Sequence, residues 1–189
     1  GNAVPAARMV CSTWSAYSWV ETGAVGMPNC RSSVALDAAT GKAKWTTTLG
    51  GLLTNNWGDG PRGTPTVDGG RVYALSGPGD LVCADARNGD VIWKTSMSEF
   101  GGQVPNWGYT ESVLVDGDTV LCTPCASKAA MAALDAKTGK LIWKTEVKNA
   151  GGAGGYSSPV KMTIGKTGVY VNLLGKDGGV IGVDAKTGK

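Results

Sequence analysis

The stretch 133–143 reads ALDAKTGKLIW, and close variants of it recur along the chain. They read ALDAATGKAKW at 35–45, CADARNGDVIW at 83–93 and GVDAKTGK at 182–189. Their aspartates, Asp37, Asp85, Asp135 and Asp184, are 48, 50 and 49 residues apart. Four copies at nearly constant spacing define a repeat, and a period of about 50 residues is typical of proteins built from one structural unit used many times.

Each copy predicts a β-hairpin. The Asp side chain can accept amide hydrogens of the turn, and the Gly supplies a backbone with positive φ. The predicted turns are Thr40-Gly41, Asn88-Gly89, Thr138-Gly139 and Thr187-Gly188. The strand after each of the first three turns carries a tryptophan, namely Trp45, Trp93 and Trp143, which we expect to be buried. A turn former, a glycine and a large ring are structural features, so the repeat itself predicts no catalysis.

A second strand–turn–strand element precedes each later hairpin, over about 64–75, 112–122 and 158–171. Each period therefore holds about four strands, and no stretch shows the 3.6-residue periodicity of an amphipathic helix. Four strands in about 50 residues predict an all-β fold, a β-propeller of four-stranded antiparallel blades.

Composition excludes several function classes. The chain has 189 residues, a formal charge of +3 and no Lys/Arg cluster, so a nucleic-acid groove is not expected. Histidine is absent, which excludes His-based triads, His-ligated zinc and axial-His haem within this chain. No apolar run reaches the roughly 20 residues of a membrane span. A charged-then-apolar leader is missing at Gly1, so we expect any secretion signal to be absent or already removed.

The pattern Ala-x-Asp-x-x-Thr-Gly-Lys-x-x-Trp resembles the tryptophan-docking repeat of quinoprotein (PQQ-type) β-propellers over nearly all of residues 35–189. The segments 60–66 and 107–118 look like those of bacterial PQQ-like repeat proteins. Related propellers are the alcohol dehydrogenases that bind pyrroloquinoline quinone (PQQ) and the lipoprotein of the outer-membrane β-barrel assembly machinery. The resemblance implies that each Trp docks between adjacent blades, and that the visible blades, about four, belong to an eight-bladed ring.

We therefore expect residues 1–189 to form one partial propeller domain. The expected blades are about 1–48 with an insertion at 14–31, then 62–96, 110–146 and 156–189, the last without its outer strand. Residues 8–11 are the expected second strand of the first blade. Three whole motifs and one partial motif cannot close a ring of eight, so the chain is either half of a longer polypeptide or a truncated one.

The loops that enter the inner strands are the candidate binding site, because equivalent loops of successive blades should ring one mouth of the central channel. The cofactor-binding candidates are Arg62, Trp57, Trp107, Tyr109 and Glu111, and the metal candidates are Asp59 and Glu111. A planar anionic quinone would suit an Arg with a stacking ring, and calcium would suit carboxylate oxygens. The alternative is that Arg62 and Glu111 pair or stay solvated while the Trp rings cap the channel.

Five cysteines leave at least one without a partner in the chain. Cys11 and Cys30 flank the insertion and could form a disulfide in an oxidising compartment, whereas Cys83 is expected to be a buried thiol. Cys122 and Cys125 have redox spacing, but no helix follows them as a thioredoxin-like site requires. The glycine-rich stretch 151–155 has no Lys-Ser/Thr, so we interpret it as a connection between blades.

Two function classes remain. The first is a non-enzymatic scaffold or interaction module of the bacterial cell envelope, periplasmic or extracellular. It would have no cofactor, and its partner would be another protein or the rest of the propeller. The second is a PQQ- and calcium-dependent dehydrogenase that oxidises alcohols or sugars. No catalytic residue can be assigned, and the adjacent Cys-Cys pair of active quinoprotein dehydrogenases is missing. Both observations favour the first class.

Overall fold

The computed structural model describes residues 8–9, 32–54, 56, 60–148, 156–175 and 179–189. These residues form fourteen strands and one short 3₁₀ helix. The strands are β1 (Arg8–Met9), β2 (Ser32–Leu36), β3 (Ala43–Thr48), β4 (Thr66–Asp68), β5 (Arg71–Leu75), β6 (Asp80–Asp85), β7 (Val91–Ser96), β8 (Leu114–Asp116), β9 (Thr119–Cys122), β10 (Met131–Asp135), β11 (Leu141–Thr145), β12 (Val160–Ile164), β13 (Thr167–Leu174) and β14 (Gly179–Asp184).

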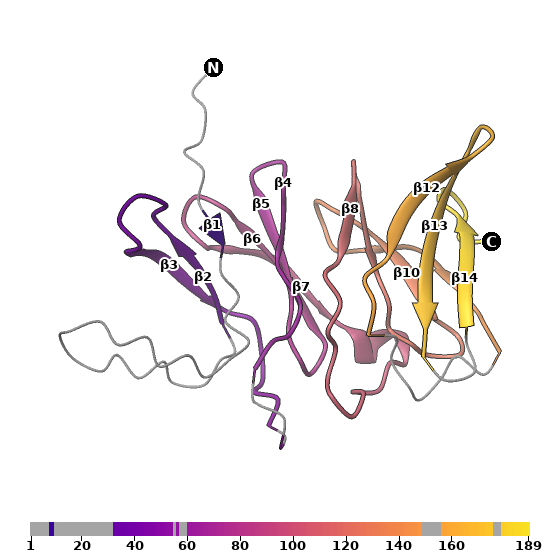
Figure 1. The fold of residues 1–189 in the computed structure, drawn as a ribbon, viewed down its shortest axis with the longest axis horizontal. Helices are drawn as coiled ribbons and strands as arrows, with labels where there is room; N and C mark the ends of the chain where they lie inside the picture. The colour runs from indigo at the N-terminus through magenta and orange to yellow at the C-terminus, as the bar shows by residue number, and fades with distance from the viewer. Residues whose placement is uncertain (1–7, 10–31, 55, 57–59, 149–155, 176–178) are drawn as a thin grey trace.

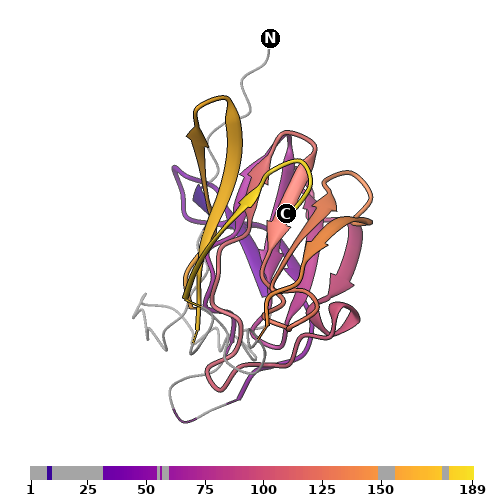
Figure 2. The ribbon, with the colours of Figure 1, turned by 90° about the vertical axis from the view of Figure 1, so that its right-hand side faces the viewer.

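The strands pair into four antiparallel sheets, which lie side by side in chain order (Figure 1). The first sheet holds β1–β3, the second β4–β7, the third β8–β11 and the fourth β12–β14, and within each sheet the spatial order follows the sequence order. Figure 2 looks along this row, with the fourth sheet nearest the viewer. The prediction of a partial β-propeller made of antiparallel blades is confirmed.

The repeated turns form because every Asp bonds to its own turn. In the first sheet Asp37 Oδ1 accepts hydrogen bonds from the amides of Ala39 and Thr40 and from the Thr40 hydroxyl. Asp135 and Asp184 accept the same three bonds, and Asp85 accepts from Arg87 instead. The glycine that ends each turn has φ between 69° and 79°, a conformation that other residues adopt at a cost. All four predicted turns are confirmed.

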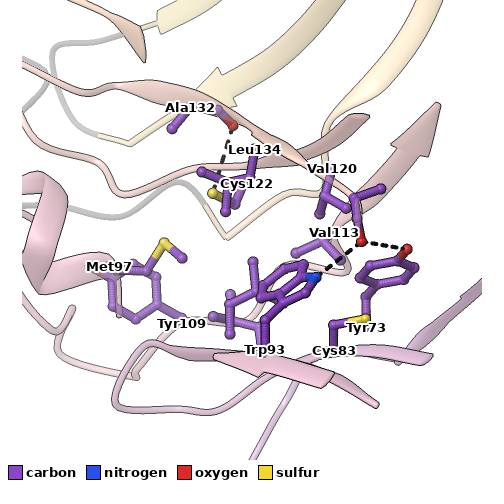
Figure 3. Packing of buried hydrophobic residues seen from close by; sticks show 13 residues of the cluster. Tyr73, Cys83, Trp93, Met97, Tyr109, Val113, Val120, Cys122, Ala132 and Leu134 are labelled. Atoms are coloured by element: carbon purple, nitrogen blue, oxygen red, sulfur yellow. Dashed lines mark hydrogen bonds between the residues drawn. The ribbon is translucent and has the colours of Figure 1, made fainter. Parts of the chain in front are cut away.

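The core lies between the sheets, because each interior sheet buries both of its faces. Leu81 and Cys83 alternate with Val82 and Ala84 along β6, and all four side chains are buried. Tyr73 and Trp93 of the second sheet pack against Val120 and Leu134 of the third, as Figure 3 shows. Each sheet therefore depends on its neighbours in the row for burial of its apolar side chains.

The tryptophans of the repeat lie against the turn of the next sheet. The Trp45 indole N–H donates to the Ala86 carbonyl at 3.1 Å, and the Trp93 indole donates to the Ala136 carbonyl at 3.0 Å. Tyr73 donates to this same Ala136 oxygen at 3.2 Å (Figure 3). Trp45 and Trp93 are 9% and 8% exposed, which confirms their expected burial, whereas Trp143 is only half-buried.

A second set of contacts joins the inner loops. The Thr64 amide donates to the Ser112 hydroxyl, and the Ser112 amide donates to the Ser158 hydroxyl, each at 2.9 Å. Both bonds span neighbouring sheets, so the three loops before β4, β8 and β12 are tied in series. This arrangement places the candidate loops of the second, third and fourth sheets next to one another.

Some features lie outside the predictions or outside the described residues. The 3₁₀ helix η1 (Met97–Phe100) follows β7 and was not predicted from the sequence. Ser96 and Glu99 form a capping box at its start, a helix signal that stands directly after a strand pattern. Strand β1 confirms the expected second strand of the first blade for the two residues that are described. The insertion at 14–31, Cys11, Cys30 and the stretch 151–155 lie outside the described residues.

Candidate functional site

The six predicted site residues fall into three groups. Trp57 and Asp59 lie outside the described residues. Arg62 is half-buried, and Trp107 is 47% exposed with its ring centroid 5.1 Å from that of Tyr156 at an interplanar angle of 44°. Tyr109 and Glu111 are buried. The loops are neighbours, as predicted, but their side chains differ in how much solvent they contact.

Tyr109 lies in the core between the second and third sheets. Its hydroxyl lies 3.1 Å from the carbonyl oxygens of both Gln103 and Pro124. A methyl group on Gly79 would lie 2.6 Å from the Tyr109 ring, so this glycine allows the ring to pack closely. Burial raises the pKa of the hydroxyl above its usual range. The phenol is therefore neutral and fully engaged within the protein.

Glu111 is the most unusual charged residue of the site, because it is 3% exposed. One carboxyl oxygen, Oε1, accepts a hydrogen bond from the Thr123 amide at 2.7 Å, while the other, Oε2, is buried without a hydrogen-bond partner among the described residues. Burial raises the pKa of Glu111 to about 8, and the bond from Thr123 opposes that rise. The carboxyl group is thus largely protonated at neutral pH.

A chain of polar contacts leads from Glu111 into the fourth sheet. Thr123, whose amide binds Glu111, accepts a hydrogen bond from Asn172 Nδ2 through its hydroxyl at 3.1 Å. Asn172 Oδ1 in turn accepts from the Ser157 hydroxyl at 2.8 Å. These four residues connect the inner loops of the third and fourth sheets, and three of them, Glu111, Thr123 and Asn172, are buried while Ser157 is half-buried. Hydrogen-bonded polar groups of this kind hold loops in place.

The described residues do not fit a quinone with calcium. Calcium takes six to eight oxygen ligands, and no group of three or more Asp, Glu or Cys side chains among the described residues could hold a metal ion. Glu111 is a poor ligand because its carboxyl group is buried and largely neutral. Trp107 packs against Tyr156, and the Tyr109 ring is enclosed, so neither offers the buried stacking face that a planar quinone requires.

The described cysteines are buried. Burial raises the pKa of the Cys83 thiol to about 11 and that of Cys122 well above its usual range, so both are protonated and unreactive. The Cys122 thiol lies 3.7 Å from the Ala132 carbonyl (Figure 3). Cys125 has a positive φ of 56° and follows strand β9 without a helix. Cys83 is a buried thiol, as predicted.

A hydrophobic surface on the fourth sheet escaped the sequence analysis. In the register of β12, β13 and β14, Val160 pairs with Val171, Met162 with Val169 and Leu173 with Val180. Side chains that pair across strands or lie two apart on a strand share one face. The face therefore carries five large exposed side chains, and we name it the terminal apolar face: Val160, Met162, Ile164, Leu173 and Val180.

The opposite face of the fourth sheet contacts the third. Tyr170 and Val183 are buried there with Leu121 and Met131. At the edge of this interface, Lys161 Nζ lies 2.7 Å from Asp116 Oδ2, and the Tyr170 hydroxyl donates to the same oxygen at 2.8 Å. The bond from Lys161 is the main cause that lowers the pKa of Asp116. This polar cluster joins two sheets, and its charged groups, Lys161 and Asp116, pair with each other.

Comparisons with known proteins agree with this architecture. A family profile described as outer membrane protein assembly factor BamB matches residues 31–189. No curated protein matches. Among described residues, no helix has the length and apolar character that crossing a membrane requires.

Solved structures share the fold at low sequence identity. BamB from Moraxella catarrhalis is 23% identical with a TM-score of 0.58, over 85% of this chain and 46% of its own. Quinohemoprotein alcohol dehydrogenase from Comamonas testosteroni is 20% identical with a TM-score of 0.63, over 84% of this chain and 32% of its own. The chain thus spans less than half the length of either protein. Since the family profile covers most of the chain, the protein belongs to the PQQ-like propeller family described as outer membrane protein assembly factor BamB.

Proposed function

We propose that this chain is a non-enzymatic interaction module of the bacterial cell envelope, and that a β-sheet surface covers its terminal apolar face. The observation that carries the proposal is the exposure of Val180, which is 71%. Val180 stands four residues before Asp184, and the side chains four residues before Asp85 and Asp135 are Leu81 and Met131, both 0% exposed. The same register position is therefore buried wherever another sheet follows.

The chemistry of the terminal apolar face fits a protein partner. Five large apolar side chains on one face form a contiguous patch, and patches of this kind mark protein–protein contacts in soluble proteins. The edge strand β12 alternates apolar side chains with Lys161 and Thr163, so the polar residues face the third sheet. A sheet face with this composition suits the apolar face of another sheet.

Family membership supports a role in the cell envelope. The profile that matches the chain is named for an outer-membrane assembly factor, and the propeller of similar fold from Moraxella catarrhalis carries the same name. We propose a periplasmic or extracellular location, and a partner that is either a second protein or the rest of an eight-bladed ring. The proposal also assigns a docking role between blades to Trp45, Trp93 and Trp143, which rests on the contacts of their rings with the next turn.

Site-specific photo-crosslinking tests this proposal in cells that express the protein in its natural full length. We expect p-benzoylphenylalanine at Val180 or Leu173 to form protein adducts, because both side chains are more than half exposed in the chain alone. The same probe at the exposed Lys128, outside the terminal apolar face, is the control.

Each outcome of the crosslinking has a defined meaning. An adduct to a second protein identifies the partner, and a crosslinked peptide from the same polypeptide identifies the rest of the ring. Absence of adducts at both positions, or equal yield at Lys128, contradicts the proposal.

If the chain were instead a dehydrogenase, it would oxidise alcohols or sugars, and the scaffold proposal predicts the opposite. We expect no oxidation of alcohols or sugars when PQQ, calcium and an artificial electron acceptor are added to the purified protein. Robust turnover that is lost in Arg62→Ala or Glu111→Gln would overturn the scaffold proposal. Glu111→Gln is preferred over Ala here because the amide can still accept the hydrogen bond from Thr123.

A further inference from the structure

A cavity of about 530 Å³ lies between the third and fourth sheets. Its lining comes mainly from the turn between β8 and β9, from β11, from the turn between β12 and β13, and from the turn after β14. These parts lie at the end of the two sheets opposite to the inner loops, near the top of Figure 1, where the β12–β13 turn stands. The volume falls within the range of small-molecule sites, roughly 300–1,000 Å³.

A short side chain at one register position accounts for the cavity. Arg71 pairs with Asp85 in the second sheet, and Thr119 takes the same place opposite Asp135 in the third. The Arg71 side chain is half-buried, and its charge acts on Lys137 in the facing turn, so it occupies the interface between the second and third sheets. Thr119 reaches much less far towards the fourth sheet. The space that an arginine fills in one interface is therefore open in the next.

Two aromatic rings line the cavity. Trp143 of the third sheet and Tyr170 of the fourth have ring centroids 6.2 Å apart at an interplanar angle of 30°. The Trp143 indole is half-buried and donates no hydrogen bond to a described residue, whereas the Trp93 indole donates to the Ala136 carbonyl at 3.0 Å. The cavity thus offers flat apolar surface beside an unengaged donor.

The carboxylates of the lining are engaged within the protein. Asp116 Oδ2 lies 2.7 Å from Lys161 Nζ and accepts a hydrogen bond from the Tyr170 hydroxyl. Asp184 Oδ1 accepts three hydrogen bonds from its own turn. The negative groups of the cavity therefore already have partners.

Two ammonium groups of the lining, those of Lys166 and Lys186, form no salt bridge with a described residue. Lys186 holds the turn position of Lys137, and Lys137 Nζ lies 2.9 Å from Asp118. Gly168 takes the place of Asp118 in the fourth sheet, since the carbonyl of each accepts the amide of the alanine in the adjoining turn. Lys186 therefore lacks the carboxylate that its counterpart binds, and the cavity has positive charge close to its aromatic rings.

We propose that this cavity binds a small aromatic carboxylate. The flat ring of the ligand would lie against Trp143 and Tyr170, and its carboxylate would accept hydrogen bonds from Lys166 and Lys186. An anion is favoured over a cation because the ammonium groups of the lining are available and its carboxylates are not. This ligand site faces the third sheet, so it is separate from the terminal apolar face and does not depend on the proposed protein partner.

Fluorine NMR of 6-fluoro-2-naphthoate tests the proposal on the protein in its natural full length. The resonance of this probe should broaden in a saturable way at up to low-millimolar concentrations. The amide 6-fluoro-2-naphthamide has the same ring without the charge and should bind about five- to tenfold more weakly, because it loses two charge-assisted contacts.

Lysine variants locate the bound probe. A protein that carries both Lys166→Gln and Lys186→Gln should bind the naphthoate about five- to tenfold more weakly and the naphthamide unchanged. Lys137→Gln is the matched control, because Lys137 holds the same turn position as Lys186 but its ammonium group is paired with Asp118. This control should bind the naphthoate like the parent protein. All three lysines are exposed, so these substitutions should not disturb folding.

The variant Thr119→Met tests the cavity itself. Its longer uncharged side chain would enter the space that Arg71 fills in the preceding interface, so binding of both probes should weaken at least about tenfold. If this variant fails to fold, the lysine variants decide alone.

Three results would each overturn the proposal. They are absence of saturable broadening by the naphthoate, equal affinity for the naphthamide, and an equal loss of affinity in Lys137→Gln and the double lysine variant. Photo-crosslinking at Val180 probes the other face of the fourth sheet, so its outcome leaves this test unaffected.

Discussion

Replacing Trp93 by Ala should lower the free energy of unfolding by about 3–5 kcal/mol, the range observed when a large core ring is truncated. Trp93 is 8% exposed, and its ring lies over Gly139 and 6.0 Å from the ring of Tyr73. Truncation would open a cavity between the second and third sheets. It would also leave the Ala136 carbonyl with Tyr73 as its remaining side-chain donor (Figure 3).

Urea denaturation of three further variants tests this explanation. Trp93→Phe keeps most of the ring and loses the indole N–H, so about 1–2 kcal/mol is expected. Trp143→Ala should cost less than Trp93→Ala, because Trp143 is only half-buried. Trp107→Ala, at a 47% exposed side chain, should stay within about 1 kcal/mol of the parent. Equal losses for Trp93→Ala and Trp107→Ala would contradict a structural role for the buried indole.

The stability of the chain should fall by about 3 kcal/mol between pH 5 and pH 8 because of Glu111. Burial raises the folded-state pKa from 4.5 to about 8. Over this range the folded protein keeps a proton that the unfolded chain releases, so rising pH favours unfolding. The contribution is fully present below about pH 4.5 and is lost as pH rises through about 8.

The Glu111→Gln variant isolates this effect. An amide keeps the acceptor for the Thr123 N–H but does not titrate, so its unfolding free energy should vary much less between pH 5 and pH 8. The range from pH 5 to pH 8 suits this measurement because few other side chains titrate in it. The chain has no histidine, and the pKa values of Cys83 and Tyr73 are raised to about 11 and about 12. Parallel pH profiles for the parent and the variant would show that Glu111 is ionised in the folded state.

Local patterns in the sequence were sufficient to predict the turns and the sheets. The contacts of Asp37, Asp135 and Asp184 lie within three residues, and the glycine after each turn is set by its own φ. Features of this kind depend on neighbouring residues and are readable from a single repeat. The burial of Trp45 and Trp93 followed from the same repeat.

The candidate site depended on contacts that the sequence does not display. The predicted loop positions were close in space, but Tyr109 points into the core because its amide bonds to the Gly77 carbonyl at 2.8 Å and its hydroxyl reaches Pro124. Glu111 turns towards the Thr123 amide, twelve residues away. The binding roles of Arg62, Trp57, Trp107, Tyr109, Glu111 and Asp59 stay predictions. The terminal apolar face required the register of three strands, which a lone repeat does not specify.

Recognition between neighbouring sheets relies on main-chain groups of the receiving turn. The indole of Trp45 binds a carbonyl of Ala86, the hydroxyl of Thr47 binds a carbonyl of Gly89, and the ring rests on a residue without a side chain. An interface of this kind tolerates substitution of most side chains in the receiving turn. A gene segment encoding one repeat could thus be duplicated and inserted, and its product would already fit both neighbours. Blade number in this family can then evolve in steps of one repeat, while the remaining positions are free to acquire new partners.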